Sequence, residues 1–334
     1  MSLGERGYDI NVGRGTLARA GELFNLDRRV FIVTDSGVPA EYARQVASLA
    51  KESKILTVPE GEGSKSIDTY SRLLAEMTDF KMTRSDCAVA VGGGVVGDLT
   101  GFVAASYMRG IDFYNVPTTL LSQVDSSIGG KCAINHAGVK NIVGAFHQPR
   151  GVIIDIDTLK TLPERQIANG LAEAVKMSLT SDSALFARFE HEGVCGENIE
   201  EIIVSSLKIK KAVVEEDERE SGLRKILNLG HTLGHAIEAD TGMSDYYHGE
   251  CVAIGMLPVV SDEVRARLVP VLKKLGLPTS YSGNIDSALR LVEHDKKCEG
   301  KKISVVLVPS VGKFEIKKMY SHEFAELVRA TPLK

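Results

Sequence analysis

Apolar and polar positions follow two different rhythms along the first half of the chain. Short apolar runs that end in Gly or polar turn residues are typical of strands buried on both faces, and they lie at 29–37, 54–58, 87–94, 113–119 and 151–156. Residues 66–77 and 95–108 have helical spacing instead, with Ser66 or Asp68 as the expected N-cap of the first helix. Strands that alternate with helices predict a parallel sheet covered on both faces, which is an α/β domain.

The pattern changes near Pro163, where helix-like segments rich in Ala, Leu, Ile and charged residues take over. These segments lie at 162–181, 199–218, 230–242 and 249–268, and a strand-like exception at 301–316 predicts a hairpin that turns near 309–313. We therefore expect an α/β domain over 1–162 and a mainly helical domain over 163–334. A length of 334 residues is in keeping with two domains.

Composition narrows the class of protein. The chain is 43% apolar and 25% charged, as in ordinary globular proteins, and its net charge of −4 argues against a general nucleic-acid binder. A local cluster of Lys and Arg can still hold an anionic small molecule. Five cysteines without a C-x-x-C pattern predict a reducing, cytoplasmic location. With neither a signal peptide nor an apolar run near ~20 residues, we expect no membrane association.

A glycine motif follows the strand-like run that begins at residue 87. Gly92, Gly94 and Gly97 have the G-x-G-x-x-G spacing of a dinucleotide-binding turn. That turn normally lies early in the chain and has an acidic partner about 20 residues later, at the end of the next strand. Here about ninety residues precede the motif, and Asp112 opens an apolar run instead of closing one. A Rossmann turn, another phosphate-binding loop and a simple Gly-rich bend therefore all remain open.

Two histidines four residues apart give the strongest chemical signal. His231 and His235 share one face if their segment is helical, and His248 follows in YYHGE. Thr232 stands where a metalloprotease would have its Glu general base. Three imidazoles with a carboxylate would suit zinc or a similar divalent ion, and the alternative is a pair of histidines on a helix surface.

Polar residues also gather in the Gly-rich segment 122–146, which contains Asp125, Lys131, Lys140 and Asn141. Its Gly-Gly-Lys resembles part of a P-loop, but Cys132 stands where that motif needs Ser or Thr. The segment is either part of a binding site or a mobile surface loop with solvated lysines.

Two charged patterns lie on predicted helices of the second half. Glu173 and Lys176 are three residues apart, for which a helical ion pair is the default interpretation. Glu220, Arg224 and Asn228 follow at four-residue steps and predict one helical stripe that leads toward the histidines.

Several long segments together resemble the 3-dehydroquinate synthase family. They are GGGVVGDLTGFVAASYMRG (92–110), VPTTLLSQVDSSIGGKCAIN (116–135), KNIVGAFHQP (140–149), DERESGLRKILNLGHTLGHAIE (217–238) and YYHGE (246–250). The resemblance extends from YDINVGRG (8–15) to the segment 294–313. It implies a Rossmann-like NAD-binding α/β domain, a helical metal-binding domain and a homodimer.

The resemblance also implies a reaction. The family converts 3-deoxy-D-arabino-heptulosonate 7-phosphate to 3-dehydroquinate and phosphate, the second step of the shikimate pathway. Bound NAD+ oxidises a ring hydroxyl, phosphate is eliminated, the ketone is reduced again, and the opened ring closes by an intramolecular aldol addition. The redox cofactor is thus recycled.

Family positions can be matched to this chain one residue at a time. The three metal ligands would be Glu173, His231 and His248, with zinc or cobalt as the ion, and His235 would lie on the substrate side. Further residues that match positions around the substrate carboxylate and phosphate are Asp125, Lys131, Lys140, Asn141, Lys176, Lys210, Glu220, Arg224, Asn228 and the run Asp295, Lys296, Lys297. Arg109 matches a residue that reaches the neighbouring subunit's phosphate.

The glycine motif gains a role from the same resemblance, since it would hold the NAD pyrophosphate at a helix N-terminus. The residues that match cofactor positions are Asp35, Glu62, Lys65, Gly92, Gly93, Gly94, Val95, Gly97, Asp98, Thr118, Thr119, Asp125, Lys131, Lys140, Thr158 and Thr161. Cys132 departs from the small residue or Thr expected after Lys131.

Three other functions remain open at this point. Another sugar-phosphate cyclase would share the scaffold and cofactor but take a different phosphorylated sugar. A metal-dependent polyol dehydrogenase would release NADH. A non-catalytic, ligand-sensing relative would have lost a metal ligand.

Overall fold

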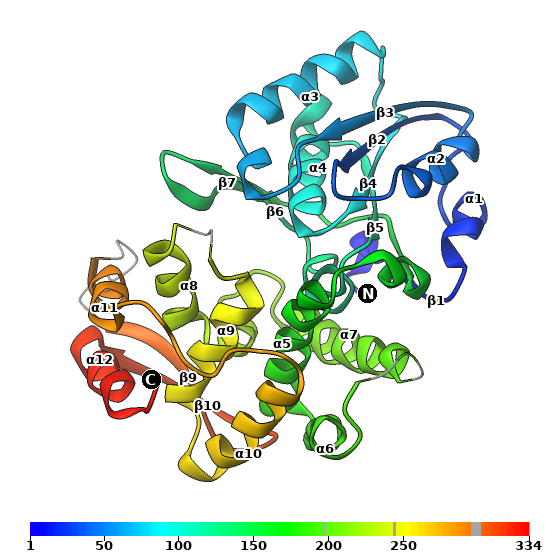
Figure 1. The fold of residues 1–334 in the computed structure, drawn as a ribbon. Coiled ribbons are helices and arrows are strands. Elements are labelled where there is room, and N and C mark those ends of the chain that lie inside the picture. The colour runs from blue at the N-terminus through cyan, green and yellow to red at the C-terminus, as the bar shows by residue number, and fades with distance from the viewer. Residues whose placement is uncertain (195, 197, 243–244, 295–301, 334) are drawn as a thin grey trace. The chain divides into compact units, whose positions relative to one another are not determined.

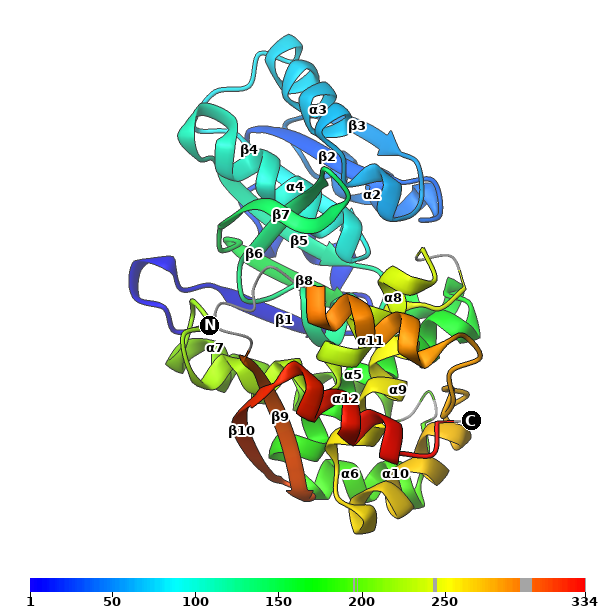
Figure 2. The same ribbon diagram turned by 90° about the vertical axis from the view of Figure 1, so that its left-hand side faces the viewer.

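The computed structural model describes residues 1–194, 196, 198–242, 245–294 and 302–333. The chain divides into two compact units, Met1–Leu162 and Pro163–Lys334 (Figures 1 and 2). Each unit has its own core.

The first unit is built on a six-stranded sheet in which every pairing is parallel. In chain order, its strands are β1 (Asp9–Gly13), β2 (Arg29–Asp35), β3 (Glu52–Val58), β4 (Cys87–Gly92), β5 (Asp112–Pro117) and β8 (Gly151–Asp155). Their order across the sheet is β1-β8-β5-β4-β2-β3. The α/β prediction is confirmed. The apolar runs did not reveal β1, because this edge strand is not fully buried and lacks a continuous apolar run.

Helices cover both faces of this sheet, which explains its apolar strands. On one face Val30 and Ile32 of β2 pack with α1 (Ala20–Leu23) and α2 (Ala40–Ser48). On the other, Phe31 and Val33 pack with α3 (Ile67–Asp79) and α4 (Gly94–Ser106) (Figure 1). The predicted N-cap of α3 is Ser66, whose side chain accepts a hydrogen bond from the Thr69 backbone N–H.

An antiparallel hairpin packs against α4. It is formed by β6 (Lys131–His136) and β7 (Val139–Phe146), so the alternative of a mobile loop is wrong for these residues. Ile134 belongs to the same core as α4, and Cys132 is a buried free thiol. A Cβ at Gly101 would overlap the Cys132 sulfur, so Cys132 has a packing role here.

The second unit is mainly helical, as predicted. Its helices are α5 (Glu164–Ser181), α6 (Ser183–His191), α7 (Ile199–Glu216), α8 (His231–Asp240), α9 (His248–Met256), α10 (Asp262–Lys274), α11 (Ile285–His294) and α12 (Ser321–Ala330). The helix α5 is central, since its residues 168–180 are all buried and it contacts α6, α7 and α9 (Figure 1). The predicted hairpin is confirmed as β9 (Lys302–Ser310) and β10 (Lys313–Tyr320).

The prediction of one helical stripe through residues 220–228 is wrong. The helix α7 ends at Glu216, Glu220 has a left-handed backbone (φ +60°), and Leu223–Asn228 form a separate 3-10 helix, η7. The cause is Asp217, whose carboxylate accepts backbone hydrogen bonds from Ser221, Gly222 and Arg224 and closes a loop. Within the described residues, no helix has the length and apolar character that crossing a membrane requires.

The contact between α4 and the hairpin gives a first prediction. Gly101→Ala should destabilise the first unit by about 1–3 kcal/mol, because the new methyl group must displace Cys132. We expect Tm to fall by roughly 2–12 °C in a thermal unfolding experiment followed by circular dichroism. Gly21→Ala in α1 is the matched control, since a Cβ there meets Leu49 at an ordinary 3.5 Å. Equal Tm values for the two variants would contradict the packing argument.

Candidate active site

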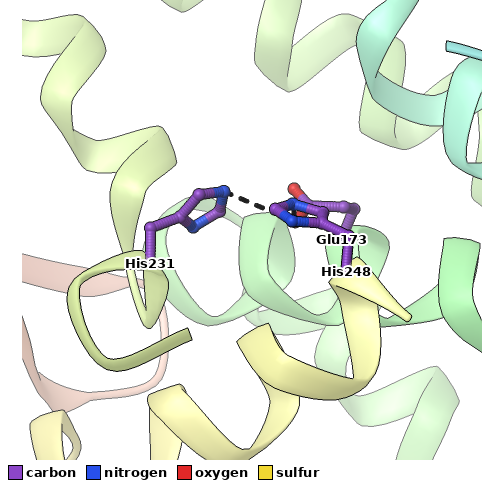
Figure 3. A group of neighbouring side chains, drawn as sticks. All are labelled: Glu173, His231 and His248. Atoms are coloured by element: carbon purple, nitrogen blue, oxygen red, sulfur yellow. Dashed lines mark ion pairs between the residues drawn. The ribbon is translucent and has the colours of Figure 1, made fainter. Parts of the chain in front are cut away.

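Three side chains from three helices of the second unit meet at one point (Figure 3). Glu173 of α5 is fully buried, His231 begins α8, and His248 begins α9. The Oε1 atom of Glu173 lies 3.8 Å from Nε2 of His231 and 3.5 Å from Nε2 of His248. This Oε1 atom is buried and has no hydrogen-bond partner among the described residues.

These distances fit a divalent ion placed between the three side chains. Two ligands of a tetrahedral zinc, each about 2.0–2.1 Å from the ion, lie about 3.3 Å apart. The observed separations are close to that value and long for hydrogen bonds. A buried carboxylate oxygen facing two imidazole nitrogens is a donor set typical of zinc or a similar ion.

One face of α5 holds the start of α9 in place. Arg165, Asn169 and Glu173 follow at four-residue steps, so they lie on the same side of the helix. Asn169 Oδ1 accepts the Gly249 N–H at 2.6 Å, and Arg165 binds the Glu250 carboxylate at 2.6 and 2.8 Å. A Cβ at Gly249 would overlap the Asn169 carbonyl oxygen, so a glycine permits this close approach. Glu173 and His248 are brought together in this way.

The helix α8 approaches α9 just as closely. Gly230 precedes His231 with φ +79°, and a Cβ at Gly255 would overlap the Gly230 carbonyl oxygen. The Nδ1 atom of His231 lies 3.1 Å from the Leu229 carbonyl oxygen. That hydrogen bond places the proton on Nδ1 and leaves Nε2 to face Glu173.

Burial and neighbouring charges shift the pKa values of the three cluster residues in different directions. Burial alone would raise the pKa of Glu173, but Lys176 and the two imidazoles hold that pKa well below its usual range. Burial and the Lys176 charge lower the pKa of His231 far below its ordinary value. Burial opposes protonation of His248 too, yet Glu173 and Glu238 raise its pKa to about 9. Glu173 is therefore ionised and His231 neutral at pH 7, the forms that bind metals.

Buried basic side chains lie on α5 and on the elements that pack against it. Lys176 is 1% exposed, forms an ion pair with Glu173 and donates to the Leu227 carbonyl at 2.6 Å. Lys210 of α7 and Arg224 of η7 are 5% and 2% exposed, and α5, α7 and η7 pack together. Three buried cations in a chain of net charge −4 suit an anionic ligand.

The remaining predicted substrate residues of this unit lie in the described part with one exception. His235 is exposed on the His231 side of α8, with ring centroids 5.2 Å apart, which confirms the shared face. Asn228 donates to the Glu220 carboxylate across the loop. The predicted run Asp295, Lys296, Lys297 lies outside the described residues.

A second candidate site lies in the first unit, at the point where the chain changes the direction in which it adds strands to the sheet. From β2 the chain moves outward to β3, then returns to β4 on the other side of β2. Ligands of doubly wound sheets bind at such a switch point, beyond the carboxyl ends of the strands. Asp35 ends β2, and Gly92 ends β4 just before α4 begins.

The glycines at this point leave room that other residues would fill. A Cβ at Gly93 would lie 3.0 Å from the Thr119 side chain, and one at Gly94 would lie 2.9 Å from Ser126 Oγ. That Ser126 oxygen is buried without a hydrogen-bond partner among the described residues. The backbone N–H groups at the start of α4 and this hydroxyl are groups suited to bind a pyrophosphate.

A hydrogen-bonded network connects several predicted cofactor residues. Lys65 Nζ donates to Asp98 Oδ2 at 2.7 Å and to the Asn141 side chain. Asn135 Nδ2 donates to Glu62 at 2.9 Å, and Asn135 Oδ1 accepts the Asn141 backbone N–H. Burial would lower the pKa of Lys65, but Asp98 and Glu62 outweigh it and raise that pKa. The network joins the loop after β3 to α4 and the β6–β7 hairpin.

The other predicted residues of the first unit are spread around this sheet edge. Asp35 is 8% exposed, and burial and Glu60 raise its pKa. The Thr118 N–H donates to the Gly92 carbonyl. The Thr158 hydroxyl accepts a hydrogen bond from the Gln123 side chain and donates one to the Asp155 carbonyl. The rest lie as follows: Val95 and Gly97 in α4, Thr119 after β5, Asp125 in the short π-helix Ser122–Ser126, Lys131 and Lys140 exposed on the hairpin, Thr161 beside Tyr42, and Arg109 exposed after α4.

Comparison with known proteins identifies the family. The family model for the 3-dehydroquinate synthase N-terminal region matches residues 55–169, and the model for the C-terminal region matches residues 170–298. The chain belongs to the 3-dehydroquinate synthase family. A 3-dehydroquinate synthase of Streptococcus suis is 42% identical over 96% of this chain and 97% of its own length. One from Desulforamulus reducens is 40% identical over 95% of each chain.

Solved structures extend the likeness. A 2-deoxy-scyllo-inosose synthase complexed with carbaglucose-6-phosphate, NAD+ and Co2+ is 27% identical, with a TM-score of 0.86 over 96% of each chain. A 2-epi-5-epi-valiolone synthase from Streptomyces hygroscopicus with NAD+ and Zn2+ bound is 25% identical, with a TM-score of 0.87 over 98% of this chain and 97% of its own. A probable glycerol dehydrogenase from Sinorhizobium meliloti, 15% identical with a TM-score of 0.65 over 96% of this chain and 95% of its own, shares the fold.

Two residues at these sites were not predicted from the sequence. Asn135 bridges Glu62 and Asn141, and Glu238 lies 2.7 Å from Nδ1 of His248. Glu238 stands seven residues after His231, two helical turns along α8, and that spacing on a buried face was the available signal. Asn135 carried no comparable signal, because Glu62 lies 73 positions earlier in the chain and Asn141 lies in the exposed strand β7.

The cluster predicts which histidines are needed for metal binding. We expect His231→Ala and His248→Ala to lose tight binding, with affinity reduced by more than about 100-fold, since each removes a ligand. Metal analysis after desalting measures this directly, with His235→Ala as the matched control that retains the ion. Stoichiometric metal in either ligand variant would contradict the site.

Proposed function

We propose that this chain is a 3-dehydroquinate synthase that converts 3-deoxy-D-arabino-heptulosonate 7-phosphate to 3-dehydroquinate and phosphate. Family membership over nearly the whole chain supports this proposal. The observation that carries it is the fully buried Glu173, facing two imidazoles and flanked by the buried Lys176.

In this proposal Glu173, His231 and His248 hold one divalent ion, zinc or cobalt. The ion, when bound, supplies Lewis-acid polarisation of substrate hydroxyls. Three protein ligands leave coordination positions for those hydroxyls. Lys176 keeps Glu173 ionised, which is the form of a carboxylate that binds a metal.

NAD+ would occupy the switch point of the first unit. It supplies a hydride acceptor that is regenerated within the same turnover. The start of α4 would bind the pyrophosphate through backbone N–H groups. Asp35 and Glu62 would accept hydrogen bonds from ribose hydroxyls, and Lys65 and Asp98 would fix the loop around them.

The cations supply recognition of the substrate's charged groups. Lys176, Lys210 and Arg224 would hold carboxylate or phosphate by charge-assisted hydrogen bonds. His235, Asn228 and Glu220 would bind neighbouring hydroxyls or exchange protons with them. In the first unit, Lys131, Lys140 and Asn141 of the hairpin and Asp125 of the π-helix Ser122–Ser126 match family positions that bind the substrate or the cofactor.

The second candidate function is that of another sugar-phosphate cyclase. The TM-scores of 0.86 and 0.87 to two such cyclases are compatible with it, because the scaffold alone does not distinguish the substrates. The relatives at about 40% identity favour 3-dehydroquinate synthase instead. The proposal includes a homodimer, in which the exposed Arg109 would reach the phosphate site of the second copy. It also includes a cytoplasmic location.

The first test is phosphate release from 3-deoxy-D-arabino-heptulosonate 7-phosphate in the presence of NAD+ and zinc. We expect one phosphate per product, no net increase in NADH absorbance, and loss of activity on adding a chelator. Accumulation of NADH would contradict the recycled cofactor and favour a dehydrogenase. Activity only with sedoheptulose 7-phosphate would favour the other cyclases.

The hairpin gives a second test. Lys131→Ala should lower kcat/KM by about 10- to 150-fold, because a charge-assisted contact contributes roughly 1.5–3 kcal/mol. The side chain is exposed, so the fold and Tm should be retained. Lys51→Ala, another exposed lysine of the same unit, is the control. Near-normal turnover in Lys131→Ala would contradict a binding role and indicate that Lys131 is a solvated surface residue.

A further inference from the structure

Glu238 is a buried carboxylate that no part of the proposed reaction uses. It lies in the last turns of α8, is 4% exposed, and has its Oε1 atom 2.7 Å from Nδ1 of His248. Burying a carboxylate is costly unless a donor compensates it. The His248 ring supplies such a donor, so the two side chains are suited to act as a pair.

This contact decides which nitrogen of His248 faces the ion. When an ion binds, the hydrogen bond to Glu238 keeps the remaining ring proton on Nδ1, so Nε2, which lies 3.5 Å from Glu173, is the nitrogen that faces the ion. His231 is arranged in the same way through the Leu229 carbonyl. Both rings thus present Nε2, and they differ in that His248 has a carboxylate as its acceptor.

His248 has the greater need for such a partner. Both histidines begin a helix, but the side chain of His248 is 30% exposed, compared with 13% for His231. A ring at the start of a helix, with open space beside it, can rotate unless a hydrogen bond fixes it. The Glu238 contact also comes from a different helix, so it links α8 to α9 at the cluster.

The alternative is that Glu238 is itself a metal ligand. Ligand atoms of His235, Glu238 and His248 also lie within 4.8 Å of one another. The 2.7 Å separation between Glu238 and His248 is, however, a hydrogen-bond distance, shorter than the roughly 3.3 Å between two ligands of a tetrahedral ion. The geometry favours an outer partner over a ligand.

We propose that Glu238 is a positioning residue for the metal centre, which holds the His248 imidazole in the tautomer and orientation that bind the ion. This inference rests on the metal site of the proposed function. Outer carboxylates of this kind typically change metal affinity by 10- to 100-fold.

The test compares Co2+ binding to the full chain and to four variants. Glu238→Leu removes the acceptor, and Glu238→Gln keeps an acceptor oxygen without the charge. Asp240→Asn, on the same helix and bonded to Tyr281, controls for lost charge and helix stability. Glu173→Gln removes a proposed ligand. Affinity is measured by competition with a chelating dye, and the ligand field by the Co2+ visible absorption spectrum.

We expect Glu238→Leu to bind Co2+ 10- to 100-fold more weakly with an altered absorption band, and Glu238→Gln to lose less affinity. Asp240→Asn should match the unmodified chain in both readouts. Unchanged affinity and spectrum in Glu238→Leu, with Tm monitored, would overturn the inference while leaving the metal site intact. A loss in Glu238→Leu as complete as in Glu173→Gln would instead make Glu238 a ligand. Failure of the unmodified chain to bind Co2+ would overturn the metal site itself.

Discussion

The buried ion pair between Glu173 and Lys176 is the constraint on which the second unit depends. Two charges in the middle of a buried helix cost several kcal/mol each unless nearby groups compensate them. The compensation comes from other helices, since His231, His248 and the Leu227 carbonyl approach the pair. Close helix packing is therefore required by the chemistry at the centre, and the glycines at 249 and 255 permit it.

The candidate site of the first unit would bind charged groups in a different way. Its candidate anion site uses backbone N–H groups and small residues at the start of α4, where few side-chain charges are needed. Charged residues lie beside it, where the buried Lys65 links Asp98 to Glu62 in the loop after β3. A fixed cofactor can be held by such a preformed frame. A divalent ion and an anionic substrate need buried charges.

Much of the fold follows from local pattern, and the failures have identifiable causes. The buried strands β2, β4 and β5 are continuous apolar runs, and α3 and α4 have clear helical spacing. The hairpin β6–β7 was not predicted as strands because its outer strand is almost entirely exposed and rich in polar residues. The stripe through Glu220, Arg224 and Asn228 failed because Asp217 captures backbone N–H groups that a continuing helix would have used.

The candidate metal cluster marks the limit of local reasoning. Spacing places His231 and His235 on one face of α8, but it cannot say which of them faces a third helix. The structure groups Glu173 with His231 and His248, which are separated by 58 and 75 positions along the chain. Taken alone, the spacing of Glu173 and Lys176 predicts an ordinary helical ion pair, and the structure confirms the pair but buries both charges. Its further meaning arises only from the packing of α8 and α9 on α5, so family resemblance could indicate it and periodicity could not.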